Sequence, residues 1–134
     1  MSGHGANGGN GNGAGPAFGR ALVVCAHPDD PEFLFGAAVA TLVKAGARVG
    51  YVVCSDGANG SRDTAAPRER IAAGRRAEQR TAARALGVED VVFLDFPDGR
   101  LAPTDELRKS RSETARHVVP PSIVFQTPPP VAPK

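Results

Sequence analysis

Residues 21–32 read ALVVCAHPDDPE, a short apolar run followed by an abrupt polar turn. The run at 21–26 is rich in β-branched residues and carries no charge, which predicts a strand buried on both faces, as in a parallel sheet. Residues 33–45 are apolar nearly all round, so they predict a helix sandwiched against that sheet and closed by Gly46. A strand, a polar turn and a helix in this order indicate the beginning of an α/β domain.

The alternation of strands and helices continues along the chain. We predict further strands at 49–54, 91–94 and 122–126, and helices at 68–86 and 107–119, of which the last is polar and the weakest. This order predicts an α/β, Rossmann-like layered fold with a mainly parallel sheet. Polar loops follow three of the strands, at 27–32, 55–66 and 95–100. We therefore expect these loops to converge at the carboxyl edge of the sheet, where such folds bind ligands.

Two faces can be separated on the helix predicted at 68–86 by projecting its residues at about 100° each. The apolar face holds Ile71, Ala82, Ala85 and Leu86, and the opposite face, which we expect in solvent, holds Arg76, Arg80 and Arg84. Arg75 and Glu78 fall within the apolar face. Their spacing predicts a buried or half-buried ion pair that fixes the helix to the sheet, with direct substrate contact as the alternative.

The two ends of the 134-residue chain differ in composition from its middle. Eight of the 16 glycines lie in residues 1–19 and six of the 12 prolines in 120–134. We expect a flexible tail at 1–19, a folded domain at 20–126 and a proline-rich tail at 127–134.

Charge, cysteine content and hydropathy exclude several classes of protein. A formal charge of +2 is far from the dense basic stripe that nucleic-acid binding needs. Gly3, Gly5 and Gly8 have GxGxxG spacing, but they precede the first strand, so they indicate low complexity rather than a nucleotide site. The longest apolar stretch, 33–43, is too short to span a bilayer. With two cysteines and no signal-peptide pattern, we expect a cytoplasmic protein with free thiols.

The HPDD sequence at 27–30 is the densest chemical signal. His27 and Asp30 offer an imidazole nitrogen and a carboxylate oxygen, both ordinary zinc ligands, and their spacing across a proline turn can aim both at one point. Asp29 then points elsewhere and is suited to act as a general base beside a metal-bound water. The alternative is structural, with Asp29 or Asp30 capping the next helix and His27 bonded to backbone. A catalytic zinc site normally takes three protein ligands, so one more is needed.

Four motifs in order carry a resemblance to a known family. They are AHPDD at 26–30, SDG at 55–57, Arg75-x-x-Glu78 with a following Ala-Leu-Gly, and FPDG at 96–99. Over about residues 20–107 the chain resembles the zinc-dependent PIG-L (LmbE-like) deacetylases, which hydrolyse N-acetylglucosaminyl conjugates.

The resemblance implies roles for five residues. His27 and Asp30 would bind zinc or another divalent ion, and Asp29 would be the general base for attack of water on an acetamide. Asp98 would contact the substrate sugar, and Asp56 would line the pocket. The substrate class implied is a small N-acetylglucosamine-type amide, hydrolysed through a tetrahedral oxyanion.

The family's second motif, an HPDH-like sequence after the fourth strand, has no counterpart here. No histidine follows His117, and neither His4 nor His117 is placed to supply the missing ligand. Cys25 and Cys54 lie near strand ends, where they are either substitute ligands or, more simply, core residues. We therefore expect the N-terminal portion of such an enzyme, with an incomplete fold and weak or no hydrolysis. The alternatives are an inactive remnant or small-ligand binding module on the same scaffold, or a nucleotide binder. The oligomeric state is open.

Overall fold

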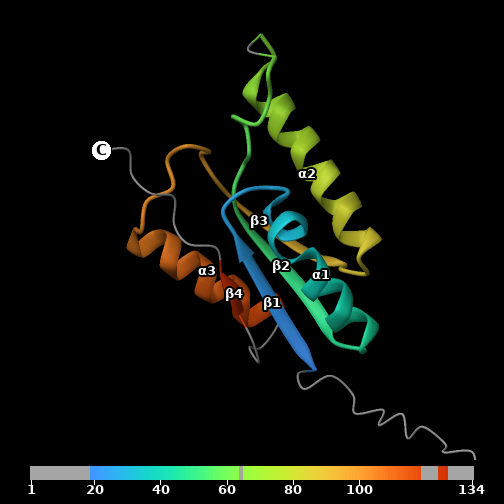
Figure 1. The fold of residues 1–134 in the computed structure, drawn as a ribbon. Coiled ribbons are helices and arrows are strands. Elements are labelled where there is room, and N and C mark those ends of the chain that lie inside the picture. Colours follow the sequence, from blue (N-terminus) through green and yellow to red (C-terminus); the bar gives the residue numbers. More distant parts are fainter. Residues whose placement is uncertain (1–18, 64, 119–123, 127–134) are drawn as a thin grey trace, which may run out of the picture.

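The computed structural model describes residues 19–63, 65–118 and 124–126, in which strands and helices alternate (Figure 1). The elements are β1 (Arg20–Cys25), α1 (Asp30–Lys44), β2 (Arg48–Ser55), α2 (Arg68–Ala85), β3 (Asp90–Phe96), α3 (Asp105–Val118) and β4 (Val124–Gln126). Each predicted element is present. The glycine motif and the two predicted tails at 1–19 and 127–134 lie, except for Gly19, outside the described residues.

The strands form one four-stranded sheet in the order β3-β2-β1-β4, and every pairing is parallel. β1 is central, with Val24 opposite Val52 of β2 on one side and opposite Gln126 of β4 on the other. The predicted parallel sheet is therefore confirmed, and the turns after β1, β2 and β3 meet at one edge.

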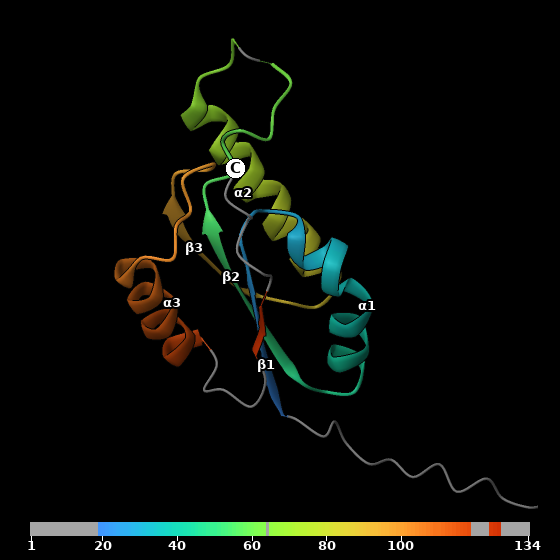
Figure 2. The same ribbon diagram turned by 60° about the vertical axis from the view of Figure 1, so that its left-hand side comes forward.

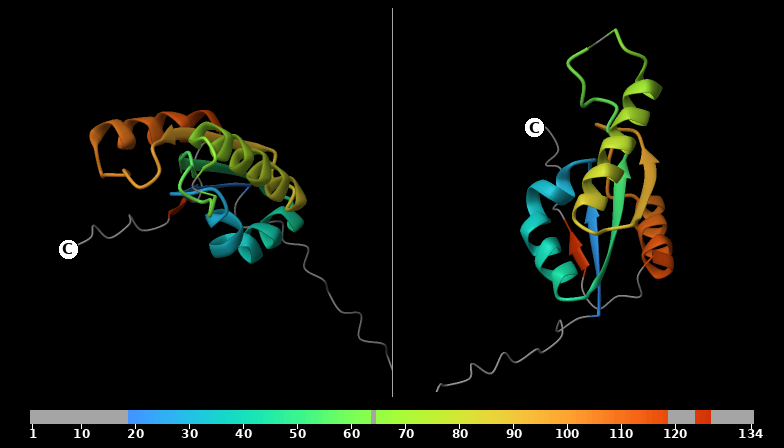
Figure 3. Two further views of the ribbon diagram at one scale, coloured as in Figure 1. Left: turned by 90° about the horizontal axis from the view of Figure 1, so that it is seen from above. Right: turned by 90° about the vertical axis from the view of Figure 1, so that its right-hand side faces the viewer.

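Side chains alternate between two apolar cores on the two faces of the sheet. Ala21, Val23 and Cys25 of β1 pack with Val39 of α1 and Ala83 of α2. Leu22 and Val24 point the other way, toward Leu107 of α3. Figure 2 shows α1 and α2 on one side of the sheet and α3 on the other, and Figure 3 shows the same layers from above and from the side. Burial on both faces explains why the strands are continuous apolar runs.

Helix α1 differs from the prediction in the way it packs. Its N-terminus has two large apolar side chains in solvent, Phe33 at 86% and Leu34 at 59% exposure, and only Pro31 and Val39 are buried. The helix lies against the sheet as predicted, but it covers the sheet with one side alone and its other side is in solvent. Gly46 adopts a φ of 91° after it, as predicted for a helix end.

The predicted faces of α2 are also partly wrong. Ala85 is exposed, whereas the buried residues are Ala72, Gln79 and Ala83. Arg76 is not simply solvated: it pairs with Asp95 at 2.5 Å. Arg76 and Arg80 lie over the Phe93 ring of β3. The side of the helix that meets protein is therefore rotated from the side that the apolar residues mark. No helix in the described part of the chain is long and apolar enough to cross a membrane.

Candidate active site

The turn after β1 brings His27 and Asp30 together, as their spacing predicts. The Nδ1 atom of His27 lies 3.5 Å from Oδ2 of Asp30, and the same oxygen accepts the His27 backbone N–H at 2.9 Å. Both side chains are partly exposed at the carboxyl edge, 38% for His27 and 25% for Asp30. The imidazole and the carboxylate therefore share one point that a ligand can reach.

Helix α1 begins without a side-chain cap. Asp29 is its N-cap residue, but no side-chain oxygen accepts a helix N–H there, and the Asp30 carboxylate turns back to His27 instead. The capping alternative considered for HPDD is therefore not what the structure shows. Asp29 adopts a φ of 85°, a left-handed conformation that is unfavourable for most residues with a Cβ.

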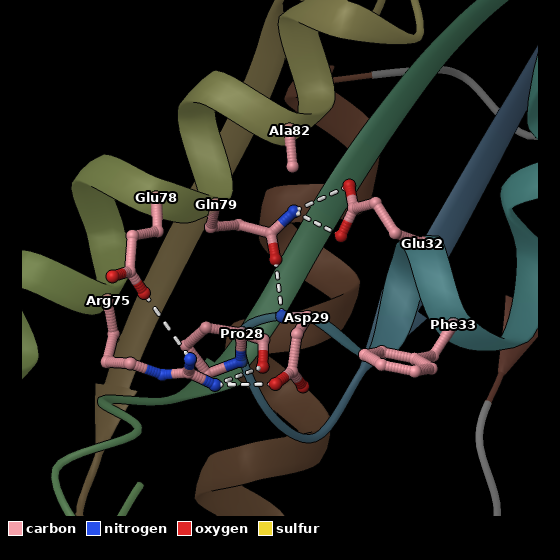
Figure 4. Close-up of a pocket in the computed structure, with 8 residues that line it drawn as sticks. All are labelled: Pro28, Asp29, Glu32, Phe33, Arg75, Glu78, Gln79 and Ala82. Atoms are coloured by element: carbon pink, nitrogen blue, oxygen red, sulfur yellow. Dashed lines mark hydrogen bonds and ion pairs between the residues drawn. The ribbon is translucent and has the colours of Figure 1, made fainter. Parts of the chain in front are cut away.

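The Asp29 carboxylate points toward α2, where Arg75 holds it. Nη2 of Arg75 lies 2.6 Å from Oδ2 of Asp29 and also donates to the Pro28 carbonyl at 3.1 Å (Figure 4). The bond to Asp29 raises the pKa of the Arg75 guanidinium above its usual value. The predicted pair with Glu78 is present at 3.4 Å. Arg75 is 24% and Glu78 71% exposed, so the pair is half-buried, the second of the two predicted forms, rather than fully buried.

Gln79 is a buried residue of the site that the sequence patterns did not predict. Its Oε1 accepts the Asp29 N–H at 2.6 Å, and its Nε2 donates to both carboxylate oxygens of Glu32, at 2.9 and 3.0 Å. Burial raises the pKa of the Glu32 carboxyl, although the bond from Gln79 opposes this. Gln79 lies four residues after Arg75, one helical turn away, and that spacing is the only sequence signal for it.

Loops after β2 and β3 close over the other side of His27. Oδ1 of Asp98 lies 3.3 Å from His27 Nε2, and Asp98 is only 10% exposed. Asp98 also accepts the Asn59 N–H at 3.0 Å, while its own N–H donates to Asp56 at 3.1 Å. Asp56 further accepts the Ala58 N–H at 3.0 Å. The structure thus brings Asp98 to the predicted metal ligand and gives Asp56 a role in joining the two loops.

The donor atoms of His27 and Asp30 suit a shared divalent ion. Two ligands of a tetrahedral zinc lie about 3.4 Å apart, given ordinary bond lengths, and the measured separation is 3.5 Å. Histidines that bind a metal commonly give their other ring N–H to a carboxylate, the position that Asp98 occupies here. His27 and Asp30 therefore fit as two ligands of such an ion. Within the described ranges no group of three His, Cys, Asp or Glu side chains is assembled.

A cavity of about 250 Å³ opens beside Asp29, between α1 and α2. It is lined by Pro28, Asp29, Glu32, Phe33, Arg75, Glu78, Gln79 and Ala82 (Figure 4). The exposed ring of Phe33 lies on one side of the Asp29 carboxylate and the guanidinium of Arg75 on the other. The cavity thus combines an apolar ring with charged groups that can accept and donate hydrogen bonds.

The cysteines are core residues. Cys25 is 1% and Cys54 5% exposed, and burial raises the pKa of both thiols. A metal ligand must be a thiolate, so this environment disfavours the alternative in which they replace a missing ligand.

We expect native protein to react with a thiol reagent such as DTNB at least about 100-fold more slowly than protein in urea, because both thiols are buried and protonated. The reaction is followed by absorbance at pH 8. Rapid modification of two thiols in the native state would contradict the burial, and a Cys54→Ala variant assigns any fast phase.

Comparisons with known proteins show the family to which the chain belongs. The family model described as PIG-L, GlcNAc-PI de-N-acetylase, matches residues 22–131. The chain therefore belongs to the PIG-L family. A curated relative, diacetylchitobiose deacetylase of Thermococcus kodakarensis, is 30% identical over 109 residues, which cover 81% of this chain and 41% of that protein.

Solved structures give the same fold. N,N'-diacetylchitobiose deacetylase from Pyrococcus horikoshii has a TM-score of 0.71 at 32% identity, over 74% of this chain and 37% of that one. The conserved protein TT1542 from Thermus thermophilus has a TM-score of 0.66 at 33% identity, covering 78% and 44%. GalB, a 4-carboxy-2-hydroxymuconate hydratase from Pseudomonas putida, has a TM-score of 0.67 at 28% identity, covering 74% and 43%. The chain spans less than half the length of each of these relatives.

Proposed function

We propose that this chain provides the metal-binding and proton-accepting part of a site for the hydrolysis of an N-acetyl amide on a small amino-sugar substrate. The observation that carries the proposal is the HPDD turn. It sets a histidine nitrogen and a carboxylate oxygen 3.5 Å apart, while the neighbouring Asp29 carboxylate faces a cavity. The GalB likeness shows that the fold alone does not select this reaction, so the proposal rests on the site.

In the proposed reaction, His27 and Asp30 would hold zinc or another divalent cation. When bound, such an ion supplies Lewis acidity and makes a coordinated water more acidic. Asp29 accepts the proton of the attacking water, and Arg75 keeps its carboxylate in place. A bond forms between the water oxygen and the acetyl carbon, the carbon–nitrogen bond breaks, and the proton held by Asp29 passes to the leaving nitrogen. The products are a free amine and acetic acid, which is released as acetate.

The cavity beside Asp29 is where we place the sugar ring. Its volume of about 250 Å³ accommodates a single pyranose, and the exposed Phe33 ring offers an apolar surface beside charged groups. Two of the similar proteins are diacetylchitobiose deacetylases, which supports an N-acetylglucosamine unit as the substrate class. Asp98 and Asp56 remain candidates for substrate contact, with Asp98 the nearer to His27.

A second candidate is a binding module that keeps the scaffold without catalysis. The cavity beside Asp29, which combines an exposed aromatic ring with charged groups and needs no metal to hold a sugar, favours it. Such a protein would bind an amino sugar in the same cavity without cleaving it. For either function, two buried free thiols support a reducing, cytoplasmic location.

Acetate release from N,N'-diacetylchitobiose, measured with and without one equivalent of zinc, tests the proposal. We expect slow, zinc-dependent release, because two protein ligands bind the ion weakly, and no release by an Asp29→Asn variant that still binds zinc. Release that is independent of metal, or unchanged in Asp29→Asn, would contradict the assigned roles. Sugar binding seen by ligand-observed NMR without any acetate release would favour the binding module.

A further inference from the structure

Gln79 is one of two buried polar residues in the described part of the chain, with 2% of its surface exposed. A buried amide is costly unless its oxygen and its nitrogen are both hydrogen-bonded. Both are satisfied here, by Asp29 and Glu32, which lie 47 to 50 positions away in the sequence. The Gln79 amide therefore links the middle of α2 to the turn between β1 and α1.

The orientation of this amide is determined by its partners. A carboxylate accepts hydrogen bonds and a backbone N–H donates one, so Nε2 must face Glu32 and Oε1 must face Asp29. The bonds to the two Glu32 oxygens, 2.9 and 3.0 Å long, hold the amide in this direction. Its oxygen is then fixed 2.6 Å from the Asp29 nitrogen.

The backbone that Gln79 holds is the strained part of the turn. Asp29 has a φ of 85° and a ψ of −28°, a conformation that is sterically unfavourable for a residue with a Cβ. Such a conformation persists only where the surroundings enforce it. Asp29 stands between His27 and Asp30, so its φ angle sets the direction in which these two side chains face each other.

We propose that Gln79 is a positioning residue, which accepts the Asp29 N–H and so maintains the left-handed turn that brings His27 and Asp30 together. Arg75, one helical turn earlier, holds the Asp29 side chain, whereas Gln79 holds its backbone. The inference rests on the proposed function only for the identity of His27 and Asp30 as metal ligands. The conformational role does not depend on it.

The test compares Gln79→Leu with wild type in the full chain by two measurements. The first is the Cα and Cβ chemical shifts of Asp29, which report the sign of φ without any metal. The second is the affinity for zinc alone, measured by titration. We expect the shifts to leave the left-handed range and zinc binding to weaken by about 10-fold, as for other residues that orient metal ligands. Thr81→Leu, at an exposed position on the same helix, is the matched control.

A rescue experiment separates positioning from general packing. Glycine adopts positive φ at no steric cost, so adding Asp29→Gly to Gln79→Leu is expected to restore most of the zinc affinity. Wild-type Asp29 shifts in Gln79→Leu, or a loss of affinity that glycine does not restore, would overturn the inference. Gln79→Asn, which keeps the amide but is one methylene shorter, gives the same comparison if Gln79→Leu does not fold. If wild type binds no zinc, the proposed function fails and the Asp29 shifts still decide the positioning role.

Discussion

Replacing His27 with alanine is expected to lower the affinity for zinc by more than about 100-fold, because residues that merely orient a ligand already contribute up to about that factor. His27 supplies the nitrogen donor of the pair, and without it the Asp30 carboxylate alone remains. Isothermal titration with zinc, at a pH where imidazole is neutral, measures the effect.

His117→Ala is the matched control for this experiment. His117 is exposed in the last turn of α3, far along the chain from the HPDD turn, and its loss should leave the affinity unchanged. An unchanged affinity in His27→Ala would remove the metal site from the proposal. A loss in His117→Ala instead would place the site elsewhere on the molecule.

Gly57→Ala is expected to lower the free energy of unfolding by about 2 to 5 kcal/mol, the sum of a left-handed alanine and an overpacked contact. Gly57 has a φ of 66°, and a Cβ there would lie 2.8 Å from Cγ of Pro28 and 2.9 Å from its Cδ. Pro28 is itself fully buried, so neither group can move away cheaply. Urea unfolding followed by circular dichroism gives the difference.

Gly74→Ala is the same substitution at another position, and it is expected to have the opposite effect on the free energy of unfolding. Gly74 lies within α2 and a Cβ there meets nothing within 4 Å, so alanine should stabilise the protein by about 0.5 to 1 kcal/mol. If both variants unfold at the same urea concentration as wild type, this result would contradict the close approach of the β2 loop to the HPDD turn.

Local sequence patterns predicted the elements well wherever burial is uniform. β1 and β2 were placed to within one residue at each end, because strands buried on both faces are continuous apolar runs. The start of α1 was placed three residues late, at 33 rather than at Asp30. Pro31 was assigned to the polar turn that ends the first strand. Proline nevertheless fits the first turn of a helix, because backbone N–H groups there have no hydrogen-bond partner within the helix.

Sequence patterns predicted the site only where its residues are close together in the chain. His27 and Asp30 are three residues apart, and a tight turn brings such neighbours together whatever the rest of the chain does. Arg75 and Gln79 reach Asp29 from 46 and 50 positions away, and no spacing rule connects residues on different elements at that range. Their side chains meet the turn because α2 packs beside α1. This packing belongs to the tertiary structure, which local sequence patterns do not specify.

The order of the strands has a consequence of its own. β2 and β3 are added on one side of β1 and β4 on the other, so the strand order reverses next to the strand that carries the HPDD turn. A reversal of this kind is a topological switch point, where chain connections diverge and leave a crevice at the carboxyl edge. The strand order therefore favours ligand binding beside the HPDD turn, and the side chains of the turn decide which ligand fits. Substitutions at His27, Asp29 or Asp30 should change the chemistry of this crevice without relocating it.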